Sequence, residues 1–271
     1  MAVIPTPTKS GSLPIKTSGF RTVPEALDYA ALGEAGYNFY NLRGELASSL
    51  PYSEVKARAQ ALAKKLAGQF ERGARVAMVA ETSPEFMTTF FACQYAGIVP
   101  APMPMPVNLG GKEGYLNQIR QMIMGAKAAA VIGPAALNGF LSEAISDFPD
   151  VRVFDFEALD TLADGEAEAI PFGPDEWCYI QYSSGSTSAP KGVIGTQASV
   201  TANLHGITTY GLKLTENDRA ASWLPLYHDM GLIGFVLSPM YGQRSVDYIA
   251  TSDFVRRPLL WLRLMSENRT T

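Results

Sequence analysis

The sequence lacks an apolar run that is long enough to cross a bilayer. The longest run, GLIGFVLSPMYG from Gly231, contains a proline and falls short of the roughly 20 apolar residues that a membrane helix needs. The N-terminal residues MAVIPTPTKSGSLPIKTSG hold too short an apolar stretch for a secretory signal peptide. We therefore expect a soluble, cytoplasmic protein without a membrane span.

The sequence is also poor in cysteine and has no excess of basic residues. Its two cysteines, Cys93 and Cys178, lie far apart without a CxxC pair or metal-ligand spacing, so we expect buried free thiols in a reducing compartment. The net charge of −4 argues against nucleic acid as the main partner, because phosphate backbones are bound by basic surfaces. With 47% hydrophobic and 18% charged residues, the composition is that of a globular protein with a sizeable core.

Helical and strand-like patterns alternate after the first 21 residues. RVAMVA (75–80) is typical of a buried strand. The next run predicts a helix with Ser83 as its N-cap, Pro84 at its first position and Gly97 just past its end. The proline-rich run IVPAPMPMP (98–106) is extended but unsuited to the centre of a sheet.

Further strand-like runs alternate with helical ones along the chain, at 128–133, 151–156 and 177–184. This order predicts an α/β fold with mostly parallel sheets that are flanked by helices on both faces. Residues 1–21, rich in Pro, Ser, Thr and Lys, are expected to form a mobile extension.

A polar loop follows the last of these strands, within QYSSGSTSAPKGVIGT (181–196). Gly185 permits unusual backbone angles, and the surrounding hydroxyl and N–H groups form a donor set that suits a polyphosphate. Lys191 adds a cation that can reach phosphate oxygens. Neither GxxxxGK[ST] nor GxGxxG is present. A plain flexible linker has a similar composition, so the residues alone leave both interpretations open.

A second polar island, Tyr227, His228 and Asp229, separates an apolar run from an apolar, glycine-containing helix that is predicted to begin near Met230. Histidine at such a switch is either a general base or pocket-lining residue, or a local cap with Asp229 as the N-cap. Because the sequence has no GxSxG elbow, a hydrolase-type Ser-His-Asp triad is not indicated. We interpret His205 as structural or superficial.

Near the end of the sequence, Arg256 and Arg257 precede Pro258 at a predicted helix start. Paired arginines can clamp an anion, but we favour a positioning or surface role.

Taken together and in this order, SSGSTSAPKGV, LPLYHDMGLIG and FVRRPLLWL resemble the adenylate-forming superfamily of acyl-CoA synthetases, luciferases and peptide-synthetase adenylation domains. Within it they are most similar to the fatty acyl-AMP ligases. The resemblance implies the N-terminal part of an AMP-binding large domain over residues 22–271. In that arrangement, residues 72–200 form one sheet subdomain, and residues 22–71 with 201–271 form part of a second.

The resemblance also implies an activity. A fatty acid is activated with ATP and Mg²⁺ to a fatty acyl-adenylate, pyrophosphate is released, and the acyl group passes to an acyl carrier protein or carrier domain in lipid, polyketide or lipopeptide biosynthesis. A long-chain acyl-CoA synthetase, with coenzyme A as acceptor, is one alternative. A non-catalytic fragment that binds nucleotide phosphates, or an interaction module, is the other.

Two groups of site residues follow from the resemblance. The ATP phosphates would be bound by Ser183, Ser184, Gly185, Ser186, Thr187, Ser188, Lys191 and Gly192. The acyl pocket would be lined by Tyr227, His228, Asp229, Met230 and Gly231.

His228 would stand on the carboxylate side of the acyl pocket and would not be a general base, since a fatty carboxylate is already ionised at neutral pH. Ser188 stands where many members have glycine. The family's later segments, with its ribose, metal and catalytic-lysine contacts, have no counterpart in this sequence. The metal ligand is therefore expected outside this chain, and the chain alone is expected to be inactive.

Overall fold

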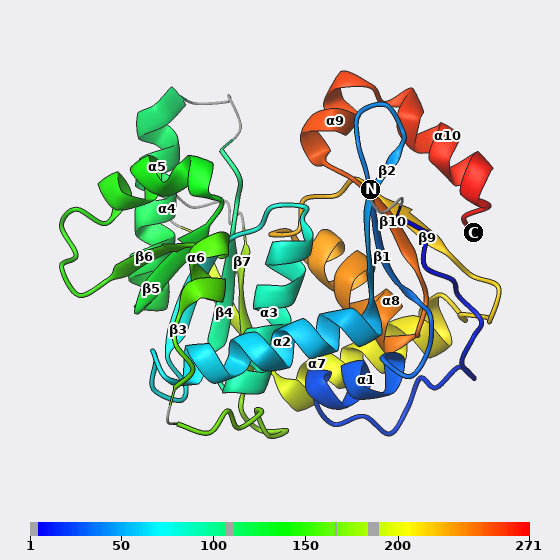
Figure 1. Cartoon of the computed structure of the whole chain (residues 1–271), viewed down its shortest axis with the longest axis horizontal. Coiled ribbons are helices and arrows are strands. Elements are labelled where there is room, and N and C mark those ends of the chain that lie inside the picture. The colour runs from blue at the N-terminus through cyan, green and yellow to red at the C-terminus, as the bar shows by residue number, and fades with distance from the viewer. Residues whose placement is uncertain (1–4, 107–110, 166, 184–189) are drawn as a thin grey trace. The chain divides into compact units, whose positions relative to one another are not determined.

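A computed structural model describes residues 5–106, 111–165, 167–183 and 190–271 (Figure 1). The chain packs as two compact units. Unit 1 comprises residues 1–57, 82–84 and 198–271, and unit 2 comprises residues 58–81 and 85–197. Helix α2 (Tyr52–Ala67) contributes to both units. The subdomain boundaries that the sequence predicts near residues 72 and 200 refer to a complete enzyme, so for this chain they remain a prediction.

Unit 2 is built on four parallel strands in the order β4-β3-β5-β6. The strands are β3 (Arg75–Val79), β4 (Val99–Met103), β5 (Ala130–Gly133) and β6 (Arg152–Asp155). The helices are α3 (Pro84–Ala96), α4 (Gly111–Ala126), the 3-10 helix η1 (Ala135–Leu137), α5 (Asn138–Ala144) and α6 (Phe156–Thr161). The central strands are buried, as expected where helices cover both faces of a parallel sheet.

Two local predictions in unit 2 are confirmed. Helix α3 begins at Pro84, and Gly97 follows it with a φ of +67°, a left-handed conformation that favours glycine. The proline-rich strand β4 is the outermost strand of its ladder. Pro100 and Pro102 carry no N–H group, so β4 cannot be hydrogen-bonded fully on both sides.

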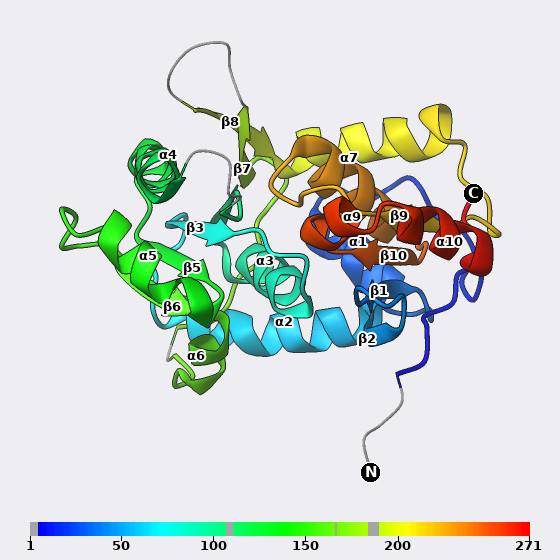
Figure 2. The same cartoon turned by 90° about the horizontal axis from the view of Figure 1, so that it is seen from above.

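Unit 2 also contains an antiparallel pair, β7 (Trp177–Ser183) with β8 (Lys191–Thr196) (Figure 2). Both cysteines of the chain are buried in unit 2 as free thiols, as predicted. Burial raises the pKa of the Cys93 thiol to about 12, and it raises the pKa of Cys178 as well.

Unit 1 is built on a four-stranded sheet in the order β2-β1-β10-β9, in which β2 alone is antiparallel to its neighbour. The strands are β1 (Gly36–Tyr40), β2 (Leu46–Pro51), β9 (Ala220–Ser222) and β10 (Val246–Ile249). The helices are α1 (Val23–Ala30), α7 (Gln197–His205), the π-helices η2 (Gly206–Gly211) and η3 (Met230–Leu237), α8 (Ser238–Tyr241), α9 (Thr251–Arg256) and α10 (Leu259–Asn268).

The core of unit 1 is rich in tyrosine. Tyr37, Tyr52 and Tyr248 are buried, and the rings of Tyr37 and Tyr52 meet edge to face at 5.0 Å between centroids. The Tyr37 hydroxyl donates to the Val236 carbonyl oxygen over 2.9 Å, so this buried polar group is satisfied. Burial raises the pKa of all three tyrosines.

The N-terminal segment differs from the mobile extension that the sequence predicts. Residues 5–20 form neither helix nor strand, but they lie against unit 1, and Thr8 is buried. The physical reason is that side chains from distant parts of unit 1 bond the main chain of this segment, which its composition could not reveal. The α/β prediction as a whole is confirmed, since both units combine helices with mostly parallel sheets.

Candidate functional site

The antiparallel pair β7–β8 in unit 2 holds the two ends of the polar loop. In its register Ser183 lies opposite Lys191, and Tyr182 lies opposite Gly192. The Ser183 hydroxyl donates to the Lys191 carbonyl oxygen over 3.4 Å, and the side chains of both residues are exposed. The pair therefore presents a hydroxyl and an ammonium group at the start and the end of the loop.

Gly192 allows β8 to lie close to the side chains of β7. A Cβ atom at this position would lie 2.9 Å from the Cγ2 atom of Ile180 and 3.6 Å from the Tyr182 ring. The Tyr182 hydroxyl donates to the Met122 carbonyl oxygen of α4, which fixes the ring, and burial raises the tyrosine's pKa. The run Lys191–Thr196 after the loop is therefore a strand with a defined partner.

Two buried amides fix the base of the strand pair. The Gln94 side chain donates to the Cys178 carbonyl oxygen over 2.9 Å, and the Gln197 side chain donates to Gln94 over 2.6 Å. The main-chain N–H of Gln197 donates to the Glu176 carbonyl oxygen, also over 2.9 Å. Sequence reasoning missed these glutamines, because nothing local distinguishes a network-forming amide from a surface one.

The remaining predicted phosphate-binding residues lie outside the described residues; they are Ser184, Gly185, Ser186, Thr187 and Ser188. Of the predicted set, the structure thus describes Ser183, Lys191 and Gly192, and it places these three at one end of the β7–β8 pair.

The polar island of unit 1 is a tight turn between β9 and the π-helix η3. The His228 N–H donates to the Pro225 carbonyl oxygen over 3.1 Å, and the His228 carbonyl oxygen accepts from the Leu232 N–H over 2.8 Å. Helix η3 begins at Met230 as predicted, although it is a π-helix. Such helices are rare and recur at functional sites.

The imidazole of His228 is held through one nitrogen. Its Nδ1 atom lies 2.6 Å from Oδ1 of Asp229 and 3.3 Å from the Met230 nitrogen. Because a contact of 2.6 Å between nitrogen and a carboxylate oxygen requires a shared proton, we assign the hydrogen to Nδ1, which donates to Asp229. The Met230 N–H then donates to Asp229 over 2.7 Å.

Asp229 is therefore the N-cap of η3 as well as the partner of His228. Both side chains are exposed, at 57% for His228 and 60% for Asp229. The Nε2 atom of His228 is the ring nitrogen that does not contact Asp229.

Gly231 makes this geometry possible. A Cβ atom there would lie 2.0 Å from the Pro225 carbonyl oxygen and 2.7 Å from its carbonyl carbon. Since these are main-chain atoms, no side-chain rotation can relieve the overlap. The turn and the first residues of η3 can thus pack together only with glycine at position 231.

An aromatic stack stands beside the turn, and sequence reasoning missed it. The rings of Trp223 and Phe254 are 3.8 Å apart between centroids and nearly parallel, at 2°. The Thr251 hydroxyl donates to the Trp223 carbonyl oxygen over 2.8 Å. The apolar run that precedes the polar island is not itself a strand, since β9 ends at Ser222.

The other candidates have local roles. His205 Nδ1 bonds the Thr17 carbonyl oxygen, which supports a structural interpretation. Arg257 donates to the Leu42 carbonyl oxygen over 2.7 Å, and Arg256 is exposed. Within the part of the chain that the structure describes, no three His, Cys, Asp or Glu side chains gather as a metal site, and no helix has the length and apolarity to cross a membrane.

Comparison with known proteins agrees with this fold. The sequence model of the AMP-binding enzyme family matches residues 36–271, so the chain belongs to this family. A Caulobacter vibrioides protein named "Putative acyl-CoA synthetase" is 45% identical over 98% of this chain and 46% of its own length. The medium-chain-fatty-acid–[acyl-carrier-protein] ligase JamA of Moorena producens is 28% identical over 93% of this chain and 43% of its own length.

A solved structure from a study of fatty acyl-adenylate ligases from E. coli and L. pneumophila is also similar, with a TM-score of 0.92 and 43% identity. The match covers 95% of this chain and 46% of that one, and it confirms the fold as that of the N-terminal region of adenylate-forming enzymes. The chain spans about half the length of the curated relatives that it matches.

Proposed function

We propose that the protein to which this chain belongs activates a fatty acid with ATP and passes the acyl group to an acyl carrier protein or carrier domain, in lipid, polyketide or lipopeptide biosynthesis. The observation that carries the proposal is the β7–β8 pair, which holds Ser183 opposite Lys191 at the ends of a hydroxyl-rich loop. Family membership and a carrier-protein ligase among the relatives support it.

In the first step, a carboxylate oxygen of the fatty acid forms a bond to the α-phosphorus of ATP, and pyrophosphate leaves with the electrons of the broken P–O bond. The loop residues 183–188, with Lys191 and Gly192, bind the β- and γ-phosphates in this proposal. Lys191 offsets the charge that develops on the leaving pyrophosphate, which is an electrostatic and positioning role. Mg²⁺ would enter with ATP and would neutralise part of the phosphate charge.

In the same proposal, the polar turn forms part of the acyl pocket through Tyr227, His228, Asp229, Met230 and Gly231. The bond to Asp229 orients the His228 ring, and a protonated ring would donate from Nε2 to a carboxylate oxygen. No general base is required, because the fatty carboxylate is ionised at neutral pH. The acceptor thiol then loses its proton to solvent and its sulfur forms a bond to the acyl carbon, while the bond from that carbon to the phosphate oxygen breaks and AMP leaves with its electrons.

A second candidate is an acyl-CoA synthetase, which the name of the 45% identical relative favours. The two differ only in the thiol that accepts the acyl group. Loading assays with a holo acyl carrier protein and with coenzyme A, run side by side, separate them. A third candidate is a non-catalytic fragment or interaction module.

The test is fatty-acid-dependent exchange of pyrophosphate into ATP. A chain extended to the full length of its relatives should catalyse this exchange with a saturated acid between about C8 and C18, and the 271-residue chain should not, because it covers about half of that length. In the extended chain, Lys191→Ala should raise the KM for ATP about tenfold or more, since a charge-assisted bond to phosphate contributes about 1.5–3 kcal/mol. The KM for the fatty acid should change less.

Lys64→Ala is the matched control, since Lys64 is an exposed helical residue outside the strand pair. If the extended chain shows no exchange with any acid in this range, the ligase proposal is wrong. If Lys191→Ala leaves the ATP dependence unchanged, Lys191 does not belong to the site.

A further inference from the structure

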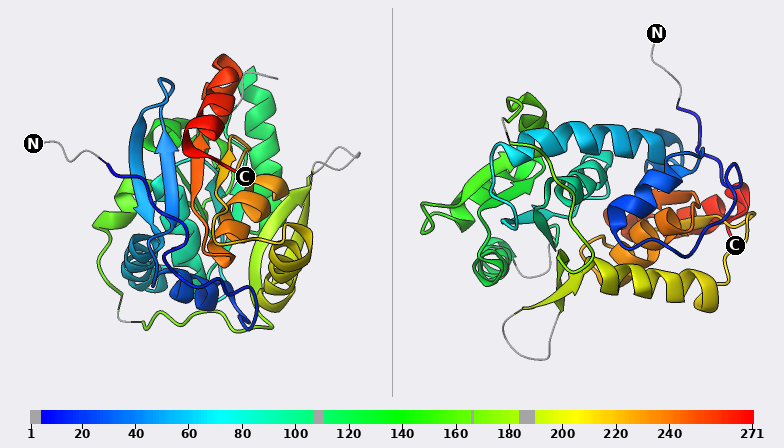
Figure 3. Two further views of the ribbon diagram at one scale, coloured as in Figure 1. Left: turned by 90° about the vertical axis from the view of Figure 1, so that its right-hand side faces the viewer. Right: turned by 90° about the horizontal axis from the view of Figure 1, so that it is seen from below.

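Residues 8–17 run along unit 1 and form no regular secondary structure (Figure 3). A segment outside a sheet must have its main-chain groups satisfied in some other way. Here side chains of unit 1 satisfy many of them. The surface that carries these side chains therefore resembles a binding site for a peptide, occupied by the same chain.

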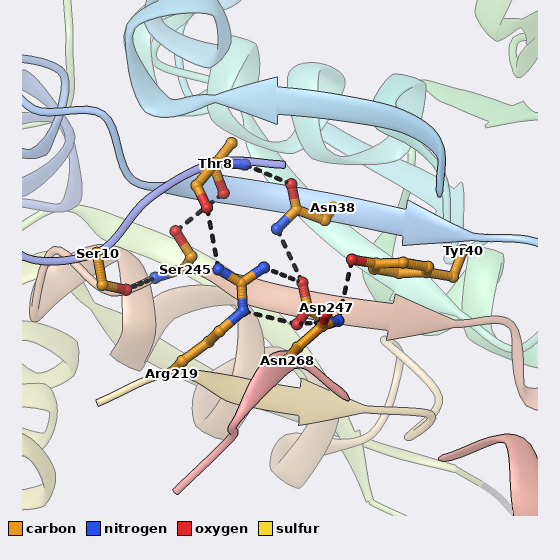
Figure 4. A network of polar contacts seen from close by, with 8 residues as sticks. All are labelled: Thr8, Ser10, Asn38, Tyr40, Arg219, Ser245, Asp247 and Asn268. Atoms are coloured by element: carbon orange, nitrogen blue, oxygen red, sulfur yellow. Dashed lines mark hydrogen bonds and ion pairs between the residues drawn. The ribbon is translucent and has the colours of Figure 1, made fainter. Parts of the chain in front are cut away.

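Thr8 is bonded through its main chain and its side chain (Figure 4). Its N–H donates to Oδ1 of Asn38 over 2.9 Å, and its carbonyl oxygen accepts from Nη1 of Arg219 over 3.0 Å. Its hydroxyl donates to the Ser245 hydroxyl over 2.9 Å. Thr8 is only 5% exposed, so these bonds are shielded from water.

A buried carboxylate orients two of these partners independently of the segment. Asp247 on β10 is fully buried and accepts from Nε of Arg219 over 2.7 Å and from Nδ2 of Asn38 over 2.8 Å. Asn268 adds a further bond to Asp247 over 3.0 Å, from the end of α10 (Figure 4). Arg219 and Asn38 are thus held in the positions that Thr8 requires, which lowers the entropy cost of binding.

Gln243 bonds the other end of the segment. Its amide oxygen accepts from the Lys16 N–H over 2.8 Å, and its amide nitrogen donates to the Lys16 carbonyl oxygen over 2.9 Å. The amide therefore pairs with the main chain of Lys16 much as a neighbouring strand would. Gln243 is buried and has a φ of +54°, a conformation that a residue other than glycine adopts at a cost.

Two serines of the segment also accept hydrogen bonds from main-chain N–H groups of unit 1. The Ser245 N–H donates to the Ser10 hydroxyl over 2.9 Å, and the Glu34 N–H donates to the Ser12 hydroxyl over 2.7 Å. A Cβ atom on Gly33 would lie 3.1 Å from the Ser12 hydroxyl oxygen, so a larger residue there would crowd the segment.

We propose that this surface of unit 1 is a peptide-binding site that recognises the main chain and the small hydroxyl side chains of an extended segment, with residues 8–17 as its intramolecular ligand. The partners Asn38, Arg219, Gln243 and Ser245 belong to the folded part of unit 1. The segment can therefore leave, and a peptide of the same sequence can replace it, while the sheet β2-β1-β10-β9 stays folded. The covalent link between the segment and unit 1 keeps the site occupied, because it gives the segment a high effective concentration at the site.

The test uses the 271-residue chain with a protease site inserted between Ser18 and Gly19, which are both exposed. After cleavage, the N-terminal piece should dissociate on dilution. A fluorescent synthetic peptide of residues 5–18 should rebind saturably in an anisotropy titration. The unfolding temperature of the cleaved chain should rise with peptide concentration, because the peptide binds only the folded state.

Gln243→Gly relieves the positive φ but removes both bonds to Lys16, so it should weaken peptide binding about tenfold or more. Lys213→Gly is the matched control: Lys213 also has a positive φ, of +53°, and is exposed, so peptide affinity should not change. A scrambled peptide of the same composition should bind at least about tenfold more weakly, since the bonds depend on residue order.

Three outcomes would overturn the proposal. One is a cleaved piece that leaves only when the whole chain unfolds. The second is a piece that leaves but whose peptide does not rebind saturably. The third is equal binding of the scrambled peptide. If the insertion prevents folding, hydrogen exchange on the uncleaved Gln243→Gly variant decides instead. The Lys16 amide should exchange about tenfold faster than in the parent chain, while the amides of β1 and β10 keep their exchange rates. Equal acceleration of all these amides would refute a separable segment.

Discussion

The close packing of Gly231 against the main chain of Pro225 can be tested by a substitution whose effect on stability is measured directly. In Gly231→Ala, the new methyl carbon would begin 2.0 Å from the Pro225 carbonyl oxygen, well under the 3.0 Å below which neighbouring atoms must shift. Only main-chain atoms can yield, so the turn and the start of η3 have to separate by about 1 Å or more. The same carbonyl oxygen accepts the His228 N–H, so His228 moves with it.

Gly234 provides a control within the same π-helix, because a Cβ atom there meets no heavy atom within 4 Å. Alanine is about 1 kcal/mol more favourable than glycine in a helix, so Gly234→Ala should stabilise unit 1 by about 0.5–1 kcal/mol. Gly231→Ala has the same helical gain but an overpacking cost of about 1–3 kcal/mol, near the upper end where only the backbone can yield. We expect a net destabilisation of about 1–2 kcal/mol, so the two variants differ by about 2–3 kcal/mol and in sign.

Urea unfolding of both variants, followed by tryptophan fluorescence, measures this difference through the transition midpoints at equal slope. In the extended, active protein, Gly231→Ala should also raise the KM for the fatty acid more than the KM for ATP. If both alanine variants shift the midpoint in the same direction by similar amounts, the close approach does not constrain position 231 and the reasoning fails.

Three further outcomes are expected. Asp247→Asn leaves Arg219 mostly buried without a counter-charge and should cost about 3 kcal/mol in urea unfolding, as buried pairs do when one partner is removed. The Arg72 guanidinium lowers the pKa of Glu176, so the stability that this pair contributes is complete above the ordinary carboxyl pKa and is lost as the pH falls through the lowered pKa of Glu176. Glu176→Gln should therefore reduce the change in the urea midpoint between about pH 6 and pH 3. Neither Cys93 nor Cys178 should react with a maleimide at neutral pH before unfolding, because burial raises the pKa of both thiols and shields them.

Much of the fold could be predicted from local pattern. The run RVAMVA becomes the buried strand β3, and the proline-glycine punctuation at Pro84 and Gly97 marks both ends of α3. These signals work because strand burial and helix termini depend on residues within a few positions of each other. The N-terminal segment could not be predicted in this way. Its Pro, Ser and Thr content is typical of mobile chain, and its partners Arg219 and Gln243 lie more than 200 positions away.

The polar turn, too, was predictable from the sequence only in part. The polar triplet between two apolar runs predicted a helix that begins near Met230, and the structure has it, with Asp229 as its cap. The sequence did not reveal the stack of Trp223 on Phe254, because these residues are distant in sequence, and it did not reveal the π-helical form of η3. The capping interpretation of Asp229 and the pocket interpretation of His228 are compatible, since one Asp229 oxygen bonds both the helix and the imidazole.

Strand β9 connects the two irregular features of unit 1. It has only three residues, Ala220–Ser222, with Arg219 directly before it and Trp223 directly after it. Arg219 bonds the N-terminal segment, and Trp223 leads into the turn that carries His228. All three residues of β9 pair with β10. The arginine that bonds the N-terminal segment therefore stands directly before the strand from which the polar turn departs, and its buried ion pair with Asp247 supports both features.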